Sequence, residues 1–289
     1  TLESARKKMS TNYFVPRIYL LPPGYNMRLE PPYSNYSKAL ANGSATLTCI
    51  TRVVHEGEII KENSVPLVYE KGLLVSEVPK PIVWHDHGAE WGENPGFVEL
   101  DIQTENGETS IQDYIGPVAY ATYYARGRKA LLADGPMKYA SPPTIAQIAE
   151  FGQFVEGQAI VRIDKNRDFG ESVALINPYR RPILAALSGS DGRTLPRLKI
   201  PPFSCRIMRI DELLRDKETE WVGHVQITAT NRVVLYDLKH SLADPTLLSH
   251  YEHLDPFRAD PTHMPAFKWL RISIGNLLAK RGIHLRPPY

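Results

Sequence analysis

Short apolar runs rich in β-branched residues recur along most of the chain. The run at 45–54 (ATLTCITRVV) is one, and the run at 97–102 alternates apolar and acidic residues after its first position, as a half-buried strand does. Gly, Pro and Asn separate the runs. Others lie at 73–78, 82–85, 118–124, 159–164, 172–177, 183–187, 204–210, 225–228 and 233–238. Many short strands joined by turns predict a mostly β protein built as a sandwich or barrel.

The two halves of the chain show a similar order of features. Gly43 opens a strand that Trp91 follows, and Gly170 and Trp221 stand in the same relation in the second half. This parallel predicts two tandem β-sandwich modules of immunoglobulin-like architecture, related by an internal duplication. Chance similarity between two β modules is the alternative. The likeness to immunoglobulin domains is one of strand spacing alone and implies no function.

The predicted organisation has five parts. A Pro- and Tyr-rich start favours extended chain, and a Ser-Pro-Pro segment that ends at Gly152 favours a short helix between the modules. Within the second module, Asp191-Gly192 predicts a tight turn between two strands. The parts are an extended N-terminal arm (1–42), sandwich module 1 (43–140), a helical connector (141–154), sandwich module 2 (155–262) and a basic amphipathic C-terminal helix with its tail (263–289).

Apolar residues near the C-terminus recur at helical spacing, with basic residues at other positions. Lys280 and Arg281 fall in the last predicted turn, where cations favour a helix end. This helix could pack on a module, bind a partner or a second copy, or contact an anionic membrane surface with Trp269 at the interface. The apolar positions are Phe267, Leu270, Ile274, Leu277 and Leu278.

Composition narrows the class of protein. The 289 residues carry a net charge of only +2, with 23% charged residues, so a nucleic-acid partner is not expected. No apolar run reaches the length of a membrane helix. Two cysteines, Cys49 and Cys205, lie far apart and fit a reducing compartment, which favours the cytoplasm. A leader removed ahead of Thr1 would be compatible with the periplasm or with secretion.

His85, His87 and Glu90 form the first candidate metal site. Residues two apart on a strand point to the same side, so both imidazoles could bind one divalent metal together with the carboxylate. Such a site could activate water. The alternative is an ordinary polar turn, because Gly88 follows directly.

His250 and His253 form the second candidate metal site. They would share one face of a helix and could chelate a divalent metal. The Pro-punctuated surroundings favour a polar loop instead, so no cofactor is predicted.

Tyrosine is unusually frequent, with 15 tyrosines against eight phenylalanines. Tyr120, Tyr123 and Tyr124 could line a binding surface, since tyrosine offers apolar area with a polar tip. The alternative places them in the core with their hydroxyls at its rim.

No motif of a nucleophilic, phosphate-binding or dinucleotide-binding enzyme occurs in the sequence. The leading hypothesis is therefore a non-catalytic binding or assembly protein. Its sandwich loops and terminal extensions would contact a protein partner or a second copy of the chain. The alternatives are a metal-dependent hydrolase with a His/carboxylate site and a carrier of small molecules.

Overall fold

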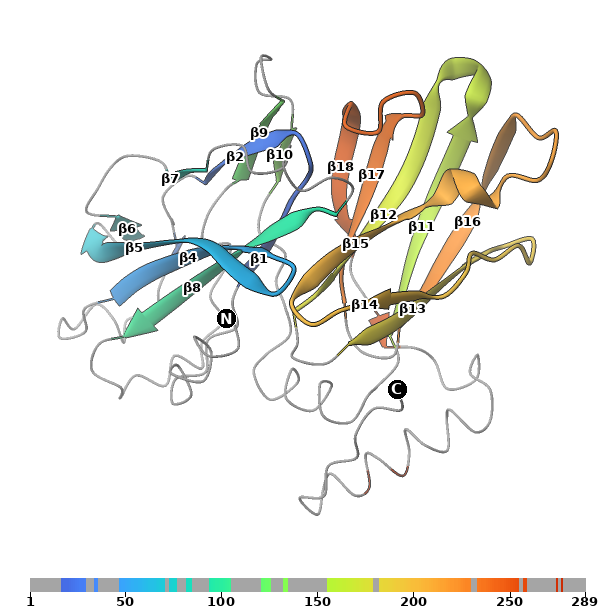
Figure 1. Ribbon diagram of the computed structural model, residues 1–289. Coiled ribbons are helices and arrows are strands. Elements are labelled where there is room, and N and C mark those ends of the chain that lie inside the picture. Colours follow the sequence, from blue (N-terminus) through green and yellow to red (C-terminus); the bar gives the residue numbers. More distant parts are fainter. Residues whose placement is uncertain are drawn as a thin grey trace. The chain divides into compact units, whose positions relative to one another are not determined.

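The protein is mostly β and divides into two compact units, Thr1–Pro142 and Pro143–Tyr289. Strands dominate the computed structural model (Figure 1), which confirms the predicted class. The division falls within 141–154, whose own structure lies outside the described residues. The structure describes residues 17–29, 34–35, 47–70, 73–76, 82–84, 94–104, 121–125, 132–134, 155–178, 182–229, 233–254, 257–258, 274 and 277.

Unit 1 contains two antiparallel sheets within its described residues. One has the strand order β1-β8-β4-β5-β6-β3 and the other β10-β9-β2-β7. The strands are β1 (Arg17–Leu21), β2 (Tyr25–Leu29), β3 (Ser34–Asn35), β4 (Leu47–His55), β5 (Glu58–Glu70), β6 (Leu73–Ser76), β7 (Ile82–Trp84), β8 (Gly96–Thr104), β9 (Ala121–Ala125) and β10 (Leu132–Asp134).

The segment 17–29 belongs to the core of unit 1 and is not an arm. β1 pairs with β8, and β2 pairs with β7 and β9, so the turn between β1 and β2 connects the two sheets. Gly24 adopts a φ of 76° in that turn. The Pro-rich flanks suggested an arm, but six apolar side chains of the two strands are buried. Those side chains belong to Ile18, Tyr19, Leu20, Leu21, Tyr25 and Met27.

Three charged residues lie side by side across the larger sheet of unit 1. Arg52 on β4 is directly opposite Glu62 on β5 and Glu99 on β8. Its Nε lies 2.6 Å from Glu62 Oε2, and its Nη1 lies 3.3 Å from Glu99 Oε1. Arg52 and Glu99 are buried. Each carboxylate thus faces its own nitrogen of one guanidinium group, a geometry that suits a buried ion pair.

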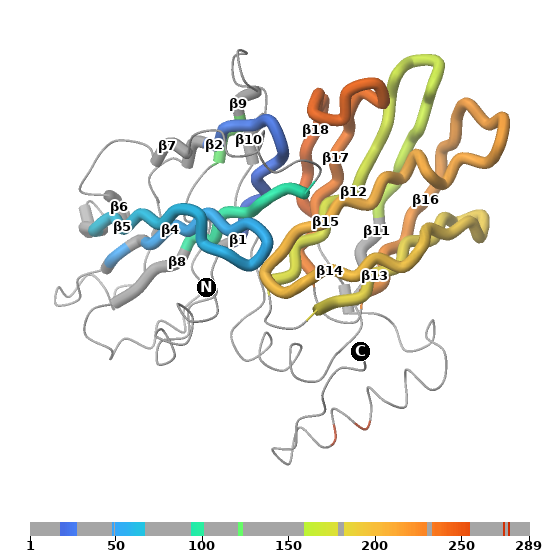
Figure 2. Tube along the Cα trace, viewed as in Figure 1, coloured from blue at the N-terminus to red at the C-terminus, as the bar shows by residue number. Residues whose placement is uncertain are grey.

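Unit 2 contains one antiparallel sheet in the order β14-β13-β16-β11-β12-β17-β18 within its described residues, with β15 paired to β12 and β19 to β11. Figure 2 follows this trace through the unit. The elements are β11 (Val155–Asp164), the 3-10 helix η2 (Lys165–Arg167), β12 (Phe169–Asn177), β13 (Ile183–Gly189), β14 (Leu198–Ile200), β15 (Ser204–Arg209), the 3-10 helix η3 (Ile210–Leu213), β16 (Glu220–Ala229), β17 (Val234–Ser241), β18 (Leu248–Leu254) and β19 (Phe257–Arg258).

Strand β12 changes its neighbour along its length. At its start it pairs with β11, through Asp164 and Phe169, and from Ser172 onward it pairs with β15. We therefore divide the sheet into a first arm, β14-β13-β16-β11, and a second arm, β15-β12-β17-β18, joined at the β11–β12 hairpin. In the first arm alternate residues are buried on one face, which we call the inner face, whereas β12 and β17 of the second arm are buried on both faces over most of their length. Tyr236 and Tyr251 stack on the inner face with ring centroids 4.9 Å apart.

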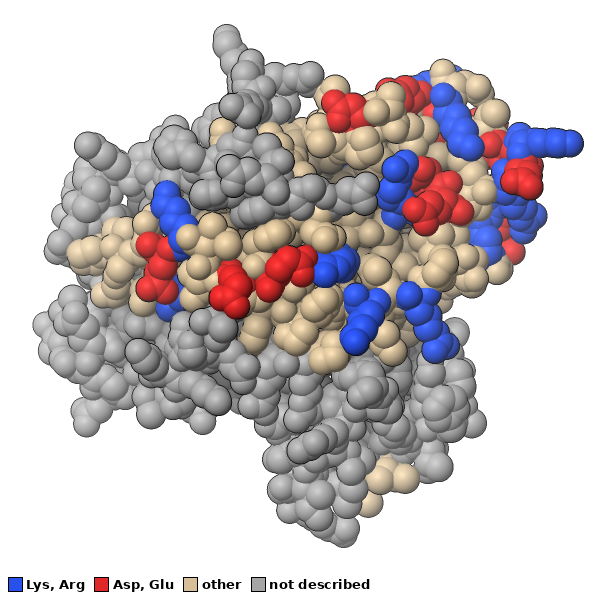
Figure 3. Space-filling view, in the orientation of Figure 1, with Lys and Arg blue, Asp and Glu red and all other residues tan. Residues whose placement is uncertain are grey.

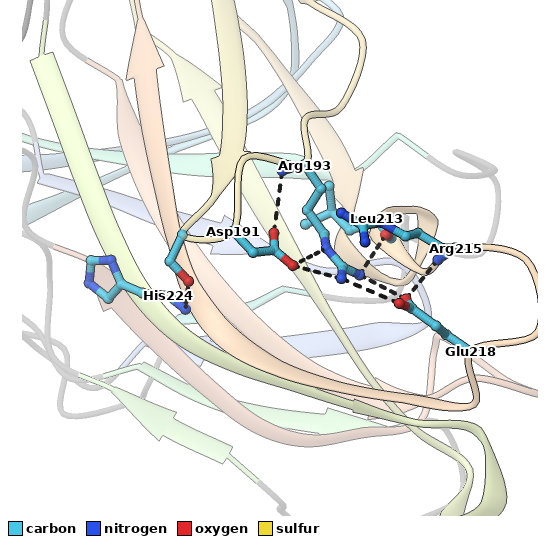
Figure 4. A network of polar contacts seen from close by, with 7 residues as sticks. Asp191, Arg193, Leu213, Arg215, Glu218 and His224 are labelled. Carbon is cyan, nitrogen blue, oxygen red and sulfur yellow. Dashed lines mark hydrogen bonds and ion pairs between the residues drawn. The ribbon is translucent and has the colours of Figure 1, made fainter.

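The turn predicted at Asp191-Gly192 is confirmed. Arg193, the next residue, connects this turn to two other segments of the unit by hydrogen bonds. Gly192 adopts a φ of 83°. Arg193 bonds to Asp191 Oδ2 at 2.7 Å, to Glu218 Oε2 at 2.9 Å and to the Leu213 carbonyl at 3.0 Å (Figure 4).

The same guanidinium group lies over the ring of Trp221, 4.9 Å from its centroid. That ring crosses Gly223, where an added Cβ would come within 2.3 Å of Trp221 Cζ2. Glycine at position 223 therefore makes room for the indole.

The strand pairing gives no support to an internal duplication. The sequence parallel equates β4 with β12 and β8 with β16. In unit 1, β4 pairs directly with β8, whereas in unit 2 β11 lies between β12 and β16. The immunoglobulin-like architecture of the two modules is not established by this topology either, because the unit 2 sheet is continuous through β11 and β12.

The segment 263–289 has two described residues, Ile274 and Leu277, and both are α-helical. Their side chains are 43% and 52% exposed. Among the residues that the structure describes, no helical segment has the length and hydropathy that a membrane crossing requires.

Candidate functional site

The first candidate metal site, His85, His87 and Glu90, lies outside the described residues, as do Tyr120 and Trp269.

Of the other candidate tyrosines, Tyr123 is fully buried on β9, in agreement with the core alternative. Tyr124 is opposite Asn26 in the pairing of β9 with β2.

His250 and His253 lie on β18, so they do not form the chelating pair that a helix would give. Residues three apart on a strand point to opposite faces. His250 is opposite Lys239, and His253 is opposite Tyr236. The segment forms a strand because Tyr251 packs on Tyr236 in the core. Within the described parts of the chain, no three His, Cys, Asp or Glu residues form a group that could hold a metal.

A serine and a histidine meet on the inner face of unit 2. His240 Nε2 lies 2.7 Å from Ser172 Oγ, and its Nδ1 lies 2.8 Å from the Ser241 carbonyl oxygen. Because a carbonyl only accepts, Nδ1 donates to it, and Nε2 shares its hydrogen bond with the serine hydroxyl. Both side chains are buried, and an added Cβ at Gly170 would come within 3.0 Å of the imidazole. This pair is a satisfied polar contact of the core.

Two carboxylates and one lysine gather on the opposite, outer face of the second arm. Glu171 on β12 is directly opposite Lys239 on β17, and Asp237 lies two residues before Lys239. Both acids are only 2% exposed. Lys239 Nζ lies 3.2 Å from Asp237 Oδ2 and 4.0 Å from Glu171 Oε1. We call these three residues the acid–lysine cluster.

The cluster lies where β12 separates from β11. There the backbone N–H of Arg162 on β11 donates to Glu171 Oε1 at 2.9 Å, so this side chain replaces a strand partner. The second oxygen of each acid, Glu171 Oε2 and Asp237 Oδ1, is buried without a hydrogen-bond partner. An ionised carboxylate in such a position is costly.

The electrostatics favour one proton within this cluster near neutral pH. Burial, together with the neighbouring negative charge of Asp237, raises the pKa of Glu171 to about 7. Burial also raises the pKa of Asp237, against the attraction of Lys239. Although burial alone would lower it, the two carboxylates raise the pKa of Lys239. A carboxyl that titrates near pH 7 can act as a general acid or base, but burial separates this one from solvent.

Aliphatic side chains are exposed on the same outer face, on the first arm. Ile160 on β11 is 75% exposed and Val222 on β16 is 61% exposed. Register places Ile160 opposite His224 and Val222 opposite Arg162, so the two aliphatic residues are diagonal neighbours on one face. We call Ile160, Arg162, Val222 and His224 the β11–β16 patch.

Uncharged residues continue this surface from β16 to β13. Gln226 and Thr228 follow on β16, and they are opposite Ser188 and Ala186 on β13. All four are half-buried. Arg162 is already paired, since its Nη2 lies 3.1 Å from Asp164 Oδ2. Acidic and basic side chains are mixed elsewhere on the visible surface of unit 2 (Figure 3). The patch is thus an apolar centre with little unpaired charge.

Sequence reasoning missed both features, although each left a signal. Ile160 and Val161 are adjacent in a predicted strand, so one of the two must face outward. Asp237 interrupts the apolar run VVLYDL, with a lysine two residues later on the same side. Comparisons with protein-family models, curated proteins and solved structures found no match. Functional inference therefore depends on these residues alone.

Proposed function

We propose that the protein is a non-catalytic binding or assembly protein that uses the β11–β16 patch to bind a protein surface. The observation that carries this proposal is the exposure of Ile160 and Val222 as diagonal neighbours on two interior strands of a sheet. Exposed apolar groups concentrated on one surface are typical of interaction sites in stable proteins.

The chemistry of the patch supports a protein partner. Two branched aliphatic side chains give apolar area that water solvates poorly. Arg162 and His224 stand beside them and can donate hydrogen bonds at the rim of an interface. Gln226 and Thr228 on β16 and their partners on β13 are neutral, so little charge would be desolvated on that side of the patch on binding.

The test is native mass spectrometry of untagged protein purified without chelators. The chain has a mass of 32.6 kDa, so subunit number and any bound metal or ligand are read together. We expect a metal-free oligomer that is lost in the double variant Ile160→Ser, Val222→Ser. The matched control is Ile60→Ser, which removes an exposed isoleucine from β5 of unit 1 and should leave the oligomer intact.

Two results would contradict the proposal. A monomer that carries a stoichiometric metal mass would favour the metal-dependent hydrolase. An oligomer that Ile160→Ser, Val222→Ser leaves unchanged would show that the patch takes no part in assembly.

A further inference from the structure

Most of the exposed large aliphatic side chains in the described part of the chain belong to unit 2. They form two sets: Ile160 and Val222 on the sheet, and Ile274 and Leu277 in the C-terminal segment. Both sets are exposed in one and the same chain, so neither covers the other within it. Two unsatisfied apolar surfaces on one chain can be buried together when a second copy is present.

The C-terminal segment has the form that a sheet surface accommodates. Ile274 and Leu277 are helical and three residues apart, so they lie on one side of a helix. The sequence extends this stripe from Phe267 to Leu278. A helix over these positions is about 16 Å long at about 1.5 Å per residue. Four strands at about 4.8 Å spacing are about 14 Å across. The stripe therefore matches the width of the first arm.

Charge favours the same pairing. No acidic residue follows Asp260, and five basic residues do. On the sheet, Glu220 is the next outward-facing residue after Val222 on β16, and it is exposed. The positive charge of Arg162 is offset by its ion pair with Asp164. A basic helix thus meets a carboxylate at one end of the patch. The exposed Lys199 lies on the same face on β14, three strands away from β11 and at the other edge of the first arm.

We infer that the protein forms a reciprocal homodimer in which the apolar stripe of each C-terminal segment covers the β11–β16 patch of the other copy. This inference rests on the proposed function and names the partner as a second copy of the chain. Two identical helix-on-sheet contacts related by a two-fold axis give a closed dimer.

The test uses two full-length variants and their mixture. The patch variant carries Ile160→Asp and Val222→Asp, and the stripe variant carries Ile274→Asp and Leu277→Asp. Each changes only exposed positions, so both should fold as the wild type does, which circular dichroism and thermal melting check. Sedimentation velocity then measures self-association of each variant and of the mixture.

We expect each variant alone to be monomeric, because every helix-on-sheet contact in its homodimer would lack either an intact patch or an intact stripe. The mixture should form heterodimers, since the patch variant supplies an intact stripe and the stripe variant an intact patch. With one contact in place of two, the heterodimer should bind on the order of 10²-fold more weakly than the wild-type dimer. Isotope labelling of one variant identifies the heterodimer by native mass spectrometry.

Several outcomes would overturn the inference. If the stripe variant still dimerises while the patch variant does not, the patches bind each other or another surface. The proposed function would then still hold, but without the reciprocal contact between stripe and patch. The wild-type protein could instead stay monomeric and bind phosphatidylcholine–phosphatidylserine vesicles, while the stripe variant does not bind them. This result would assign the helix to a membrane surface. If both variants fold but their mixture forms no heterodimer, the reciprocal homodimer is also rejected.

Discussion

Neighbouring strands of unit 2 reverse the usual placement of polar and apolar groups. On β12 and β17, the acids Glu171 and Asp237 are buried on the outer face. On β11 and β16, Ile160 and Val222 are exposed on that same face. Folded proteins ordinarily bury aliphatic side chains and leave carboxylates in water. Neither arrangement improves the stability of the isolated chain, and for the exposed Ile160 and Val222 the proposed binding surface explains it.

Unit 1 shows how one cation can pair with two acids, the buried Glu99 and the half-exposed Glu62. There, one guanidinium group faces two carboxylates with a separate nitrogen for each. In the acid–lysine cluster of unit 2 a single ammonium group serves both acids at 3.2 and 4.0 Å, and one oxygen of each acid has no partner. Arginine is a fixed fork and lysine a point charge. The comparison teaches that a guanidinium group offers each acid its own nitrogen, whereas one ammonium group shared by two buried acids leaves an oxygen of each without a partner.

Replacing Lys239 should have the largest effect on this comparison. In Lys239→Met, two buried acids lose their shared cation, and we expect a loss of about 2 kcal/mol in unfolding free energy at pH 8, below the usual cost for a fully buried pair because the lysine is partly exposed. The loss should shrink at pH 5, where Glu171, whose pKa is about 7, holds a proton. Urea denaturation at both pH values measures it, and Lys199→Met on β14, an exposed lysine, is the control. Equal losses for the two variants would contradict the cluster's role.

Neutralising Glu171 should have a smaller effect of opposite sign. Its pKa of about 7 in the folded chain exceeds the ordinary 4.5, so the folded state binds the proton more tightly. The contribution to stability is therefore present below about pH 4.5 and is lost as the pH rises through about 7. Glutamine carries no such penalty and keeps the acceptor for the Arg162 N–H.

We expect Glu171→Gln to raise the melting temperature by about 2–4 °C at pH 8, equivalent to about 1 kcal/mol, and to leave it unchanged near pH 4.5. Differential scanning calorimetry across this range measures the difference. Glu212→Gln, which changes an exposed acid of η3, should show no such trend. A constant difference between Glu171→Gln and the wild type at all pH values would show that the effect is not titration of this carboxyl.

Substitution of an exposed aliphatic residue of the patch should have the smallest effect on the stability of the protein. Ile160→Ala should change the unfolding free energy by less than about 0.5 kcal/mol, because the side chain is already in water. Val161→Ala, one residue later on the inner face, removes buried methyl groups and should cost about 2 kcal/mol. Urea denaturation at protein concentrations too low for self-association measures the unfolding free energy of both variants. A large loss for Ile160→Ala would mean that the patch stabilises the fold.

The sequence predicted the elements better than the surfaces. Alternation and turn residues located most strands, including β4, β8, β12 and β17. β5 was missed because residues 61–64 (KENS) are polar in succession and Pro66 interrupts the strand. β18 was taken for a loop because its histidines and acids hide the apolar positions, Leu248 and Tyr251.

The candidate site could not be predicted from the sequence, for a different reason. The acid–lysine cluster and the β11–β16 patch each join strands that are distant along the chain, and only strand order brings them together. Glu171 and Lys239 are 68 positions apart in numbering but directly opposite in register. Local pattern shows that Asp237 or Ile160 is unusual in its strand. It does not show what lies across from it.

Hydroxyl-radical footprinting of Ile160 and Val222, read by mass spectrometry over a range of protein concentrations, tests the central claim most directly. Ile60 of unit 1, which is also exposed, is the internal reference. If the β11–β16 patch binds a second copy, the oxidation of Ile160 and Val222 will fall relative to Ile60 as the concentration rises through the association range. If all three side chains react alike from dilute to concentrated protein, the patch stays in water and the account of assembly through it is wrong.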